Sequence, residues 1–292
     1  MRKLVALVAA ALAGASLPSV EASAGLAKYR NPTAGSALVY QIPNMHKAKV
    51  RRNLTYTRAG GSPLKLDVYR PRRAASGVLP AVLLGGPPAF RAGKDSGQKV
   101  GWAQLIAASG LAAVAFDIRS DDYMASPEAP SQDVAAAIAY VRANAARLGI
   151  DAERLCTLGF SLGTAPWHLW ATLREPQPYN RCNVVYYGPL DLTTIEIDID
   201  PAKVDEFSAI TYLRKHEGKI PPMLIAQAGR DRFAGINDSI ARFVAAAKEL
   251  GASVELRKHP TAPHGFDILT PGARSVSIIK RTLAFFRAKL LA

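Results

Sequence analysis

The chain has 292 residues and a formal net charge of +14 at pH 7, with 37 Lys and Arg against 23 Asp and Glu. The basic residues are scattered and no nucleic-acid motif accompanies them, which argues against a specific nucleic-acid partner, because net charge alone supports only non-specific binding. The length suits one large α/β domain.

The first 24 residues have the pattern of an export signal. Two basic residues are followed by an apolar run and then by the small residues 22–24, an order typical of a cleaved secretory signal peptide. The run is shorter than the roughly 20 residues of a membrane-spanning helix, and Pro18 ends it. We therefore predict cleavage near Ala24, export to the periplasm or the exterior, and no membrane span.

The next elements predict an arm and a hairpin. Residues 25–50 form an N-terminal arm to which the sequence assigns no regular structure. Residues 54–71 alternate apolar and polar side chains around a turn at Gly60 and Gly61, which predicts an antiparallel hairpin.

After the hairpin the pattern changes to apolar strands separated by amphipathic helices. Segments that are apolar on both faces predict strands covered by helices on each side, namely 80–86, 111–117, 155–160, 183–188, 223–229 and 253–259. Apolar spacings near 3.6 residues predict helices over 133–149, 237–251 and 275–291. The predicted fold is therefore α/β over residues 25–292: a mainly parallel sheet with an antiparallel N-terminal hairpin and helices on both faces. Residues 189–220 are predicted to form a loop and helix beside a pocket.

The chain contains only two cysteines, Cys156 and Cys182. An exported protein permits a disulfide, and the two residues fall in one predicted strand and at the start of the next. A bridge between neighbouring strands is geometrically demanding, so the sequence favours two buried free thiols over a bond.

A serine elbow follows the predicted strand 155–160. Gly159, Ser161 and Gly163 form the pattern G-x-S-x-G, in which the serine sits exposed on a tight turn between a strand and a helix. Serine needs such a position, together with a base and oxyanion donors, to act as a nucleophile. The alternative is that Ser161 only caps an ordinary helix.

The candidate base is a histidine from the last loop before the C-terminal helix. His264 lies on a loop after the last predicted strand, at the edge where parallel strands bring their carboxyl ends and where ligands bind. A neutral imidazole there can accept the serine proton at neutral pH. His259 is the weaker candidate, because the pattern favours a residue at the end of that strand.

The candidate acid is Asp231, which directly follows the predicted strand 223–229. A carboxylate in this role holds the tautomer of the imidazole and stabilises its charged form. Asp191, after the strand 183–188, is the rival acid. Asp231 can alternatively serve as a salt-bridge partner for Arg230 or Arg232.

The expected oxyanion donors are backbone N–H groups. The first is that of Leu162, the residue after the serine, and the second belongs to the loop after the strand 80–86. Pro87 and Pro88 in this loop have no N–H. The second donor is therefore Gly86 or a residue beyond the prolines, and Gly86 and Ala89 rank equally.

Several motifs in the right order resemble the α/β-hydrolase superfamily, nearest its carboxylesterase and dienelactone-hydrolase-like branch. The resemblance covers residues 54–290 and rests on "LKLDVYRP", "LPAVLLGG", "AFDIR", "YVRANAARLGIDAERLCTLGFSLG", "PPMLIAQAGRDRF" and "HPTAPHGFD". It implies an α/β-hydrolase fold with Ser161 as nucleophile, Asp231 as acid and His264 as base. Related esterases have His-Gly-Gly-Gly where this chain has Gly-Gly-Pro-Pro at 85–88, and dienelactone hydrolases proper have cysteine at the elbow, so the serine favours ordinary ester cleavage.

The predicted function is thus that of an exported serine hydrolase that cleaves small or polymer-linked carboxylic esters without a metal or an organic cofactor. Four aromatic residues are candidates for lining the substrate pocket, although each is more often a core residue: Phe90, Trp167, Tyr187 and Phe266. The alternatives are a non-catalytic binding protein on a hydrolase fold and a peptidase or acyltransferase with the same triad. The sequence does not determine the oligomeric state.

Overall fold

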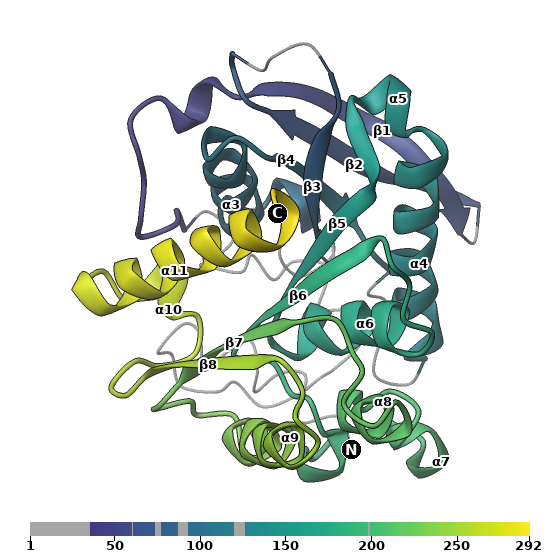
Figure 1. The fold of residues 1–292 in the computed structure, drawn as a ribbon, viewed down its shortest axis with the longest axis vertical. Helices are drawn as coiled ribbons and strands as arrows, with labels where there is room; N and C mark the ends of the chain where they lie inside the picture. The colour runs from purple at the N-terminus through teal and green to yellow at the C-terminus, as the bar shows by residue number, and fades with distance from the viewer. Residues whose placement is uncertain (1–35, 60, 74–76, 87–92, 120–125, 198) are drawn as a thin grey trace, which may run out of the picture.

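The structure of the protein is a computed structural model that describes residues 36–59, 61–73, 77–86, 93–119, 126–197 and 199–292 (Figure 1). The predicted signal peptide and residues 25–35 of the predicted arm lie outside these ranges. The described part of the arm packs against the domain, because Leu38 and Met45 are buried in its core.

Within the described residues, eight strands form one sheet in the order β1-β2-β4-β3-β5-β6-β7-β8. The predicted hairpin is present as β1 (Lys49–Ala59) and β2 (Ser62–Arg70). It joins the sheet through antiparallel pairing of β2 with β4, and the remaining strands are parallel to one another. These strands are β3 (Leu79–Gly86), β4 (Ala112–Asp117), β5 (Ile150–Phe160), β6 (Asn180–Tyr186), β7 (Met223–Ala228) and β8 (Val254–His259).

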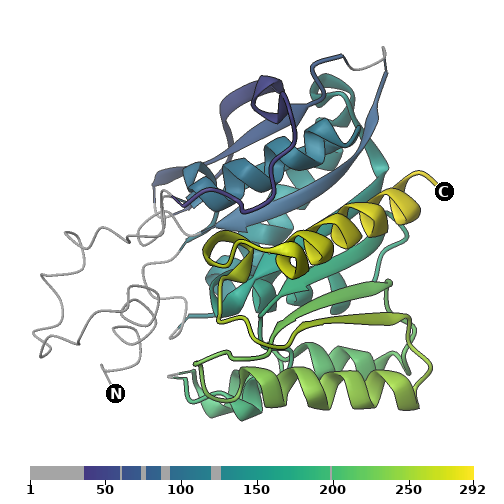
Figure 2. The ribbon, with the colours of Figure 1, turned by 90° about the vertical axis from the view of Figure 1, so that its left-hand side faces the viewer.

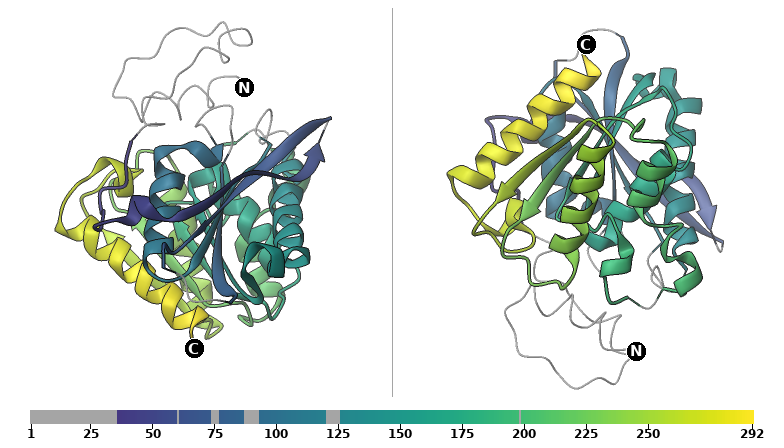
Figure 3. Two further views of the ribbon diagram at one scale, coloured as in Figure 1. Left: turned by 90° about the horizontal axis from the view of Figure 1, so that it is seen from above. Right: turned by 60° about the horizontal axis from the view of Figure 1, so that its bottom comes forward.

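Helices cover both faces of the sheet (Figures 1 and 2). One face packs against α3 (Gly97–Ala108) and α11 (Ala273–Leu290). The opposite face packs against α4 (Glu128–Ala143), α6 (Ser161–Leu173), α8 (Ala209–Lys215) and α9 (Ile236–Glu249). Figure 3 shows α11 and α4 on opposite sides of the strands. The shorter helices are η2 (Met45–Lys47), η3 (Gly93–Asp95), α5 (Ala145–Leu148), η4 (Leu192–Thr194), α7 (Pro201–Val204) and α10 (Phe266–Leu269).

The alternation of side chains along the strands explains why these segments are apolar throughout. In β3, Val82 and Leu84 contribute to the core beside α3 and α11, whereas Ala81 and Leu83 contribute to the core beside α4. A strand buried on both faces needs apolar residues at every position. The predicted fold class, including the antiparallel hairpin, is confirmed.

Two helical segments differ from the prediction. No predicted element corresponds to α3, because this helix is buried at nearly every position and has no continuous polar face that would reveal a helical period. The predicted helix 133–149 is two helices, α4 and α5, divided at Asn144. The side-chain amide of Asn144 donates to the carbonyl of Tyr140, a local bond that competes with helix continuation.

The expectation of two free thiols is wrong, because Cys156 and Cys182 form a disulfide. Strand β6 begins at Asn180, three residues before the predicted start, and its register places Cys182 directly beside Cys156 on β5. Their Cα atoms are 4.7 Å apart, which is within the range of disulfides. The register of two neighbouring strands therefore decides the bond, and a single-strand pattern does not contain it.

Membrane association through a helix finds no support in the described residues, none of whose helices combines the length and apolar character of a membrane span.

Candidate active site

Ser161 lies on a sharp turn between β5 and α6. Strand β5 ends at Phe160 and α6 begins at Ser161, whose φ of 55° is in the left-handed region that is costly for residues other than glycine. The turn requires Gly159, since a Cβ there would lie 2.7 Å from the Cα of Ala165. Gly163 faces open space, so only one of the two motif glycines is needed for packing.

The hydroxyl of Thr164 braces this turn. Its Oγ1 accepts from the backbone N–H of Phe160 at 2.6 Å and donates to the carbonyl of the same residue at 3.0 Å. Phe160 is the N-cap of α6, so the alternative that Ser161 serves as the N-cap is wrong. The Ser161 hydroxyl instead contacts the imidazole of His264.

The structure brings Ser161, His264 and Asp231 together at the carboxyl edge of the sheet. His264 follows β8, and its Nε2 lies 2.8 Å from Ser161 Oγ. Asp231 follows β7, and its Oδ2 lies 2.7 Å from His264 Nδ1. Backbone bonds from Gly229 to the His259 carbonyl and from Arg230 to the Ala262 carbonyl tie the two loops together. The side chains of His264 and Asp231 are 6% and 0% exposed.

The partners of His264 fix where its proton lies. An ionised carboxylate only accepts hydrogen bonds, so Nδ1 donates to Asp231. In the neutral ring Nε2 is then an acceptor, and it faces the Ser161 hydroxyl, which donates. The second oxygen of Asp231 accepts from the backbone N–H of Phe233 at 3.0 Å. The arrangement can therefore remove a proton from Ser161 and stabilise the resulting imidazolium.

Two aromatic rings hold the imidazole of His264. Its centroid lies 4.4 Å from the ring of Tyr187 and 4.6 Å from that of Phe233. The Tyr187 hydroxyl donates to Asp267 at 2.5 Å and accepts from Gln98 at 2.8 Å. Tyr187 is one of the predicted candidates for lining the substrate pocket. Its ring packs against the imidazole of His264, and its hydroxyl belongs to a buried polar network with Asp267 and Gln98.

The other predicted pocket residues divide into two groups. Trp167 is fully buried in the core against Phe207, and Phe266 is fully buried against Tyr186 and Tyr187. Both are core residues, so their assignment to the pocket is wrong. Aromatic spacing in the sequence cannot distinguish the two roles, because large rings serve in either. Phe90 lies outside the described residues.

The candidate oxyanion donors lie at two segment ends. Leu162 is the second residue of α6, directly after Ser161, where the first N–H groups of a helix have no intrahelical acceptor. Gly86 ends β3, and its carbonyl accepts from the N–H of Ile118 beyond β4. The N–H and C=O of one strand residue point to the same side, so the Gly86 amide faces β4 and away from β5. This orientation argues against Gly86 as a donor, and Ala89 lies outside the described residues.

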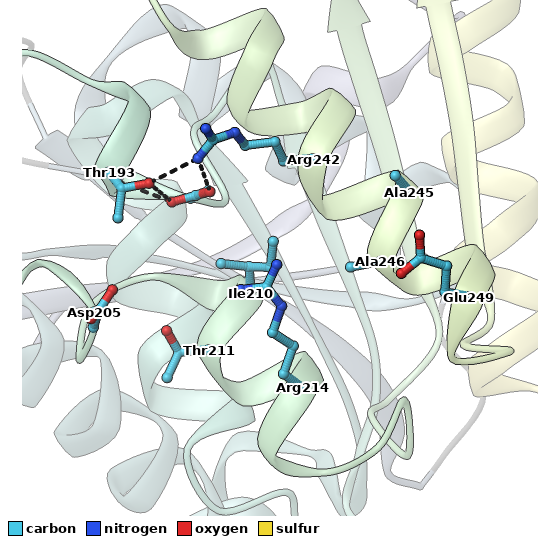
Figure 4. A pocket seen from close by; sticks show the side chains of 10 residues that line it. Thr193, Asp205, Ile210, Thr211, Arg214, Arg242, Ala245, Ala246 and Glu249 are labelled. Carbon is cyan, nitrogen blue, oxygen red and sulfur yellow. Dashed lines mark hydrogen bonds and ion pairs between the residues drawn. The ribbon is translucent and has the colours of Figure 1, made fainter.

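The rival residues have other partners. Asp191 accepts from Thr193 and pairs with Arg242 at 3.2 Å, on the wall of a crevice of about 310 Å³ beside α8 and α9. Figure 4 shows the Thr193 and Arg242 side chains converging there.

His259 ends β8 and packs against Phe266, with ring centroids 5.4 Å apart. Burial and the nearby Arg274 lower its pKa. Asp231 pairs with His264, and no ion pair joins it to Arg230 or Arg232, both of which are described.

His168, to which the sequence pattern assigns no role, lies on α6 two turns after Ser161. It is 1% exposed, and burial lowers its pKa to about 4. Its Nε2 accepts from the N–H of Gly85 at 3.1 Å, and its Nδ1 lies 2.8 Å from the Thr164 carbonyl. The spacing of seven residues, which returns to the same helix face, is the signal that places it on the side of Ser161.

In the described part of the chain, His, Cys, Asp and Glu form no group of three that could hold a metal ion.

Comparison with solved structures identifies the architecture. A carbohydrate esterase from the gut microbiota, in truncated form, superposes with a TM-score of 0.67 and 19% identity over 84% of this chain and 97% of the other. The chain has the α/β-hydrolase fold. Esterase 2 of Thermogutta terrifontis matches this hydrolase fold in a form phosphonylated by sarin, with a TM-score of 0.65, 20% identity and coverage of 84% and 96% of the two chains. Its butyrate-bound form gives a TM-score of 0.63 and 20% identity over 85% and 95%.

Sequence comparison adds one family. The model of the BD-FAE family, a family of α/β-hydrolase esterases, matches residues 66–198, which is just under half of the chain. This segment includes β3, β5 and Ser161 but ends before Asp231 and His264. A search among curated proteins found no significant match.

Proposed function

We propose that this α/β-hydrolase is a serine esterase that cleaves carboxylic esters through an acyl-enzyme. The observation that carries the proposal is the unbroken line of hydrogen bonds from Ser161 Oγ to His264 Nε2 at 2.8 Å and from His264 Nδ1 to Asp231 Oδ2 at 2.7 Å. A hydroxyl, an imidazole and a carboxylate in this order form the arrangement that activates a serine.

Each side chain has one role in the reaction. His264 accepts the proton of Ser161 while Oγ forms a bond to the ester carbonyl carbon, and Asp231 stabilises the imidazolium that results. The imidazolium then protonates the departing alcohol oxygen as the C–O bond breaks, leaving an acyl group on Ser161. Water then gives a proton to His264 and attacks the acyl carbon; the bond from this carbon to Ser161 Oγ breaks, the imidazolium returns the proton to Oγ, and the carboxylic acid leaves. The proposed reaction uses neither a metal nor an organic cofactor.

The oxyanion of the tetrahedral intermediate is held at the start of α6. The Leu162 N–H is the first donor, and the positive end of the helix dipole favours negative charge at the same place. The second donor is assigned to the loop after β3, beyond its two prolines. Removal of a single oxyanion donor typically costs roughly 10²- to 10³-fold in kcat, so this loop matters as much as the helix.

The proposed substrates are small or polymer-linked esters outside the cytoplasm. The N-terminal sequence pattern supports export after cleavage near Ala24. One structural neighbour is a carbohydrate esterase, and another was solved with butyrate bound. Both support a search that begins with short acyl groups, including acyl groups attached to sugars.

A labelling experiment tests the nucleophile without knowledge of the substrate. A fluorophosphonate probe should label the wild type and fail to label Ser161→Ala or His264→Gln. Ser275→Ala is the matched control, because Ser275 is buried on α11 and its hydroxyl has no hydrogen-bond partner among the described residues. The probe should label this variant as it labels the wild type.

Hydrolysis of p-nitrophenyl esters with acyl chains of increasing length then tests the reaction. We expect activity that is highest for short chains and is lost in Ser161→Ala. Activity that survives in this variant would remove Ser161 from the mechanism. Absence of labelling in the folded wild type would favour the alternative of a non-catalytic binding protein, and labelling without ester hydrolysis would favour a peptidase or acyltransferase.

A further inference from the structure

The side chain of His168 joins two backbone segments that lie on either side of Ser161. Its Nε2 accepts from the N–H of Gly85, near the end of β3, at 3.1 Å. Its Nδ1 lies 2.8 Å from the carbonyl oxygen of Thr164, in the first turn of α6. The two segments are 83 and 4 residues away in the sequence, so a single ring connects the strand end to the helix that begins at Ser161.

Both partners belong to the main chain, and they fix the state of the ring. A carbonyl only accepts and an amide N–H only donates, so Nδ1 carries the proton and Nε2 is the acceptor. The ring is 1% exposed. Burial and the positive charge of Lys99 hold the pKa of His168 at about 4, so the neutral ring and both hydrogen bonds persist at neutral pH.

The strand pairing of the sheet explains why the Gly85 N–H needs an acceptor that is not a backbone carbonyl of a neighbouring strand. The Gly86 amide faces β4, so that of Gly85 faces β5, because successive strand residues point their amides to opposite sides. The pairing of β3 with β5 ends at Leu83 and Thr157, since β5 turns into the serine elbow farther on. Beyond this point β5 offers no acceptor to the Gly85 amide, and His168 provides one instead.

Packing makes this contact close. A Cβ added at Gly85 would lie 3.0 Å from Cε1 of His168 and 3.0 Å from the ring of Phe116, which is shorter than ordinary van der Waals contact. The φ of Gly85 is not positive. Glycine at this position therefore serves the approach of the imidazole rather than an unusual backbone conformation.

We propose that His168 is a positioning residue for the oxyanion site, and this inference rests on the proposed esterase function. It holds the first turn of α6, which carries Ser161 and the Leu162 N–H, at a fixed distance from the end of β3. The ring has no role in proton transfer, because both of its nitrogens are occupied by main-chain groups.

The first test compares His168→Phe with His216→Phe, using p-nitrophenyl butyrate. His216 is the matched control, because its Nε2 also contacts a backbone carbonyl of α6, that of Leu173 at 3.0 Å, but at the end of the helix remote from Ser161. We expect kcat of His168→Phe to fall roughly 10- to 100-fold, because small displacements at a reacting centre have effects of this size. KM should change less than about threefold, since ground-state binding is retained.

Two readouts separate positioning from general loss of structure. His168→Gln retains an acceptor for Gly85 and a donor for Thr164, and should recover most of the lost kcat. The acidic limb of the pH profile of kcat/KM, which reports His264, should keep its midpoint in both variants. The proposal would be overturned if His168→Phe and His168→Gln lost kcat equally, or if kcat of His168→Phe fell no further than that of His216→Phe.

Gly85→Ala provides an independent test if His168→Phe does not fold. The added methyl group displaces the ring while every hydrogen-bonding atom remains, so kcat should fall. The same change should cost less in a His168→Ala background, where the imidazole is absent, and this non-additivity is the sign of one shared contact. Additive effects of the two changes would contradict the proposal.

The rate of fluorophosphonate labelling distinguishes failure of this inference from failure of the proposed function. If the folded wild type is neither labelled nor active on esters, the esterase function itself fails. If the wild type is labelled and His168→Phe is labelled at the same rate, the esterase function stands and the positioning role of His168 is overturned. A slower rate in His168→Phe, with the His216→Phe rate unchanged, supports the proposal.

Discussion

Two buried histidines lie in two different regions near Ser161, and their partners make them chemically different. His264, on the loop after β8, is 5% exposed, and His168, on the second turn of α6, is 1% exposed. Each uses both ring nitrogens. His264 contacts the Ser161 hydroxyl and the Asp231 carboxylate, whereas His168 contacts a backbone amide and a backbone carbonyl. Burial alone therefore does not identify a base: the acceptor nitrogen must face a group that can give up its proton.

The largest expected effect comes from changing the partner of the His264 Nδ1. Asp231→Asn replaces an acceptor with a side chain that can also donate, and so permits the tautomer in which Nε2 carries the proton and cannot accept one from Ser161. We expect kcat/KM for p-nitrophenyl butyrate to fall roughly 10²- to 10⁴-fold, by analogy with the serine protease triad, with the fold unchanged by circular dichroism.

Asp191→Asn is the matched control for this prediction. Asp191 also follows a parallel strand, but it pairs with Arg242 and Thr193. We expect activity within about threefold of the wild type, because this carboxylate, although buried, is bonded to Thr193 and Arg242 and not to His264 or Ser161. Equal loss of activity in the two variants would mean that Asp231 has no special link to His264.

The second prediction uses acid to separate the two histidines. The pKa of His168 is about 4 in the folded protein and near 6.5 in an unfolded chain, so between these values the unfolded state binds a proton that the folded state does not. The free energy of unfolding therefore falls as the pH falls from about 6.5 to 4. At pH 5 the loss from His168 alone is roughly 2 kcal/mol, given 1.36 kcal/mol per pKa unit.

Urea unfolding at pH 7.5 and pH 5 measures this difference. His168→Phe should lose less stability on acidification than the wild type, while His216→Phe should lose as much as the wild type. Carboxylates and His259 contribute to acid sensitivity in all three proteins, so only the difference between them is informative. Identical pH dependence in His168→Phe and the wild type would show that the ring is already accessible to protons in the folded state.

The sequence was sufficient for the features that depend on local patterns. Apolar strands, the G-x-S-x-G turn and the positions of His264 and Asp231 after successive strands predict the fold and bring three residues to one edge, as the structure has them. This works because parallel strands bring their carboxyl ends to the same edge whatever the loops between them.

The features that were missed depend on contacts between segments distant in sequence. The register of β5 and β6 places Cys182 beside Cys156, and no single-strand pattern contains that register. Helix α3 lacks a polar face because the sheet contacts it on one side and η2 and Leu38 of the N-terminal arm contact it as well. The contact of His168 with Gly85 joins residues 83 positions apart, and it becomes visible only once β3 and α6 are known to meet.

The smallest expected effect concerns the ring on which His264 rests. Tyr187→Phe keeps the aromatic face 4.4 Å from the imidazole and removes the hydroxyl that donates to Asp267. Asp267 retains donors from Gln98 and Trp102, so the free energy of unfolding should fall by about 1 kcal/mol, the usual net value of one hydrogen bond. We expect kcat to change less than about threefold, because the ring itself, and not its hydroxyl, contacts His264.

Tyr212→Phe is the control for this pair of measurements, since its hydroxyl donates to the Glu206 carbonyl at 2.6 Å, on α8 and away from Ser161. Both variants should lose similar stability, and both should keep the midpoint of the acidic limb of kcat/KM. A tenfold fall in kcat confined to Tyr187→Phe, with a shifted midpoint, would show that the buried network around Asp267 acts on the proton affinity of His264. In that case the contrast between the two histidines would be incomplete, because His264 would be tuned through its aromatic support as well as through Asp231.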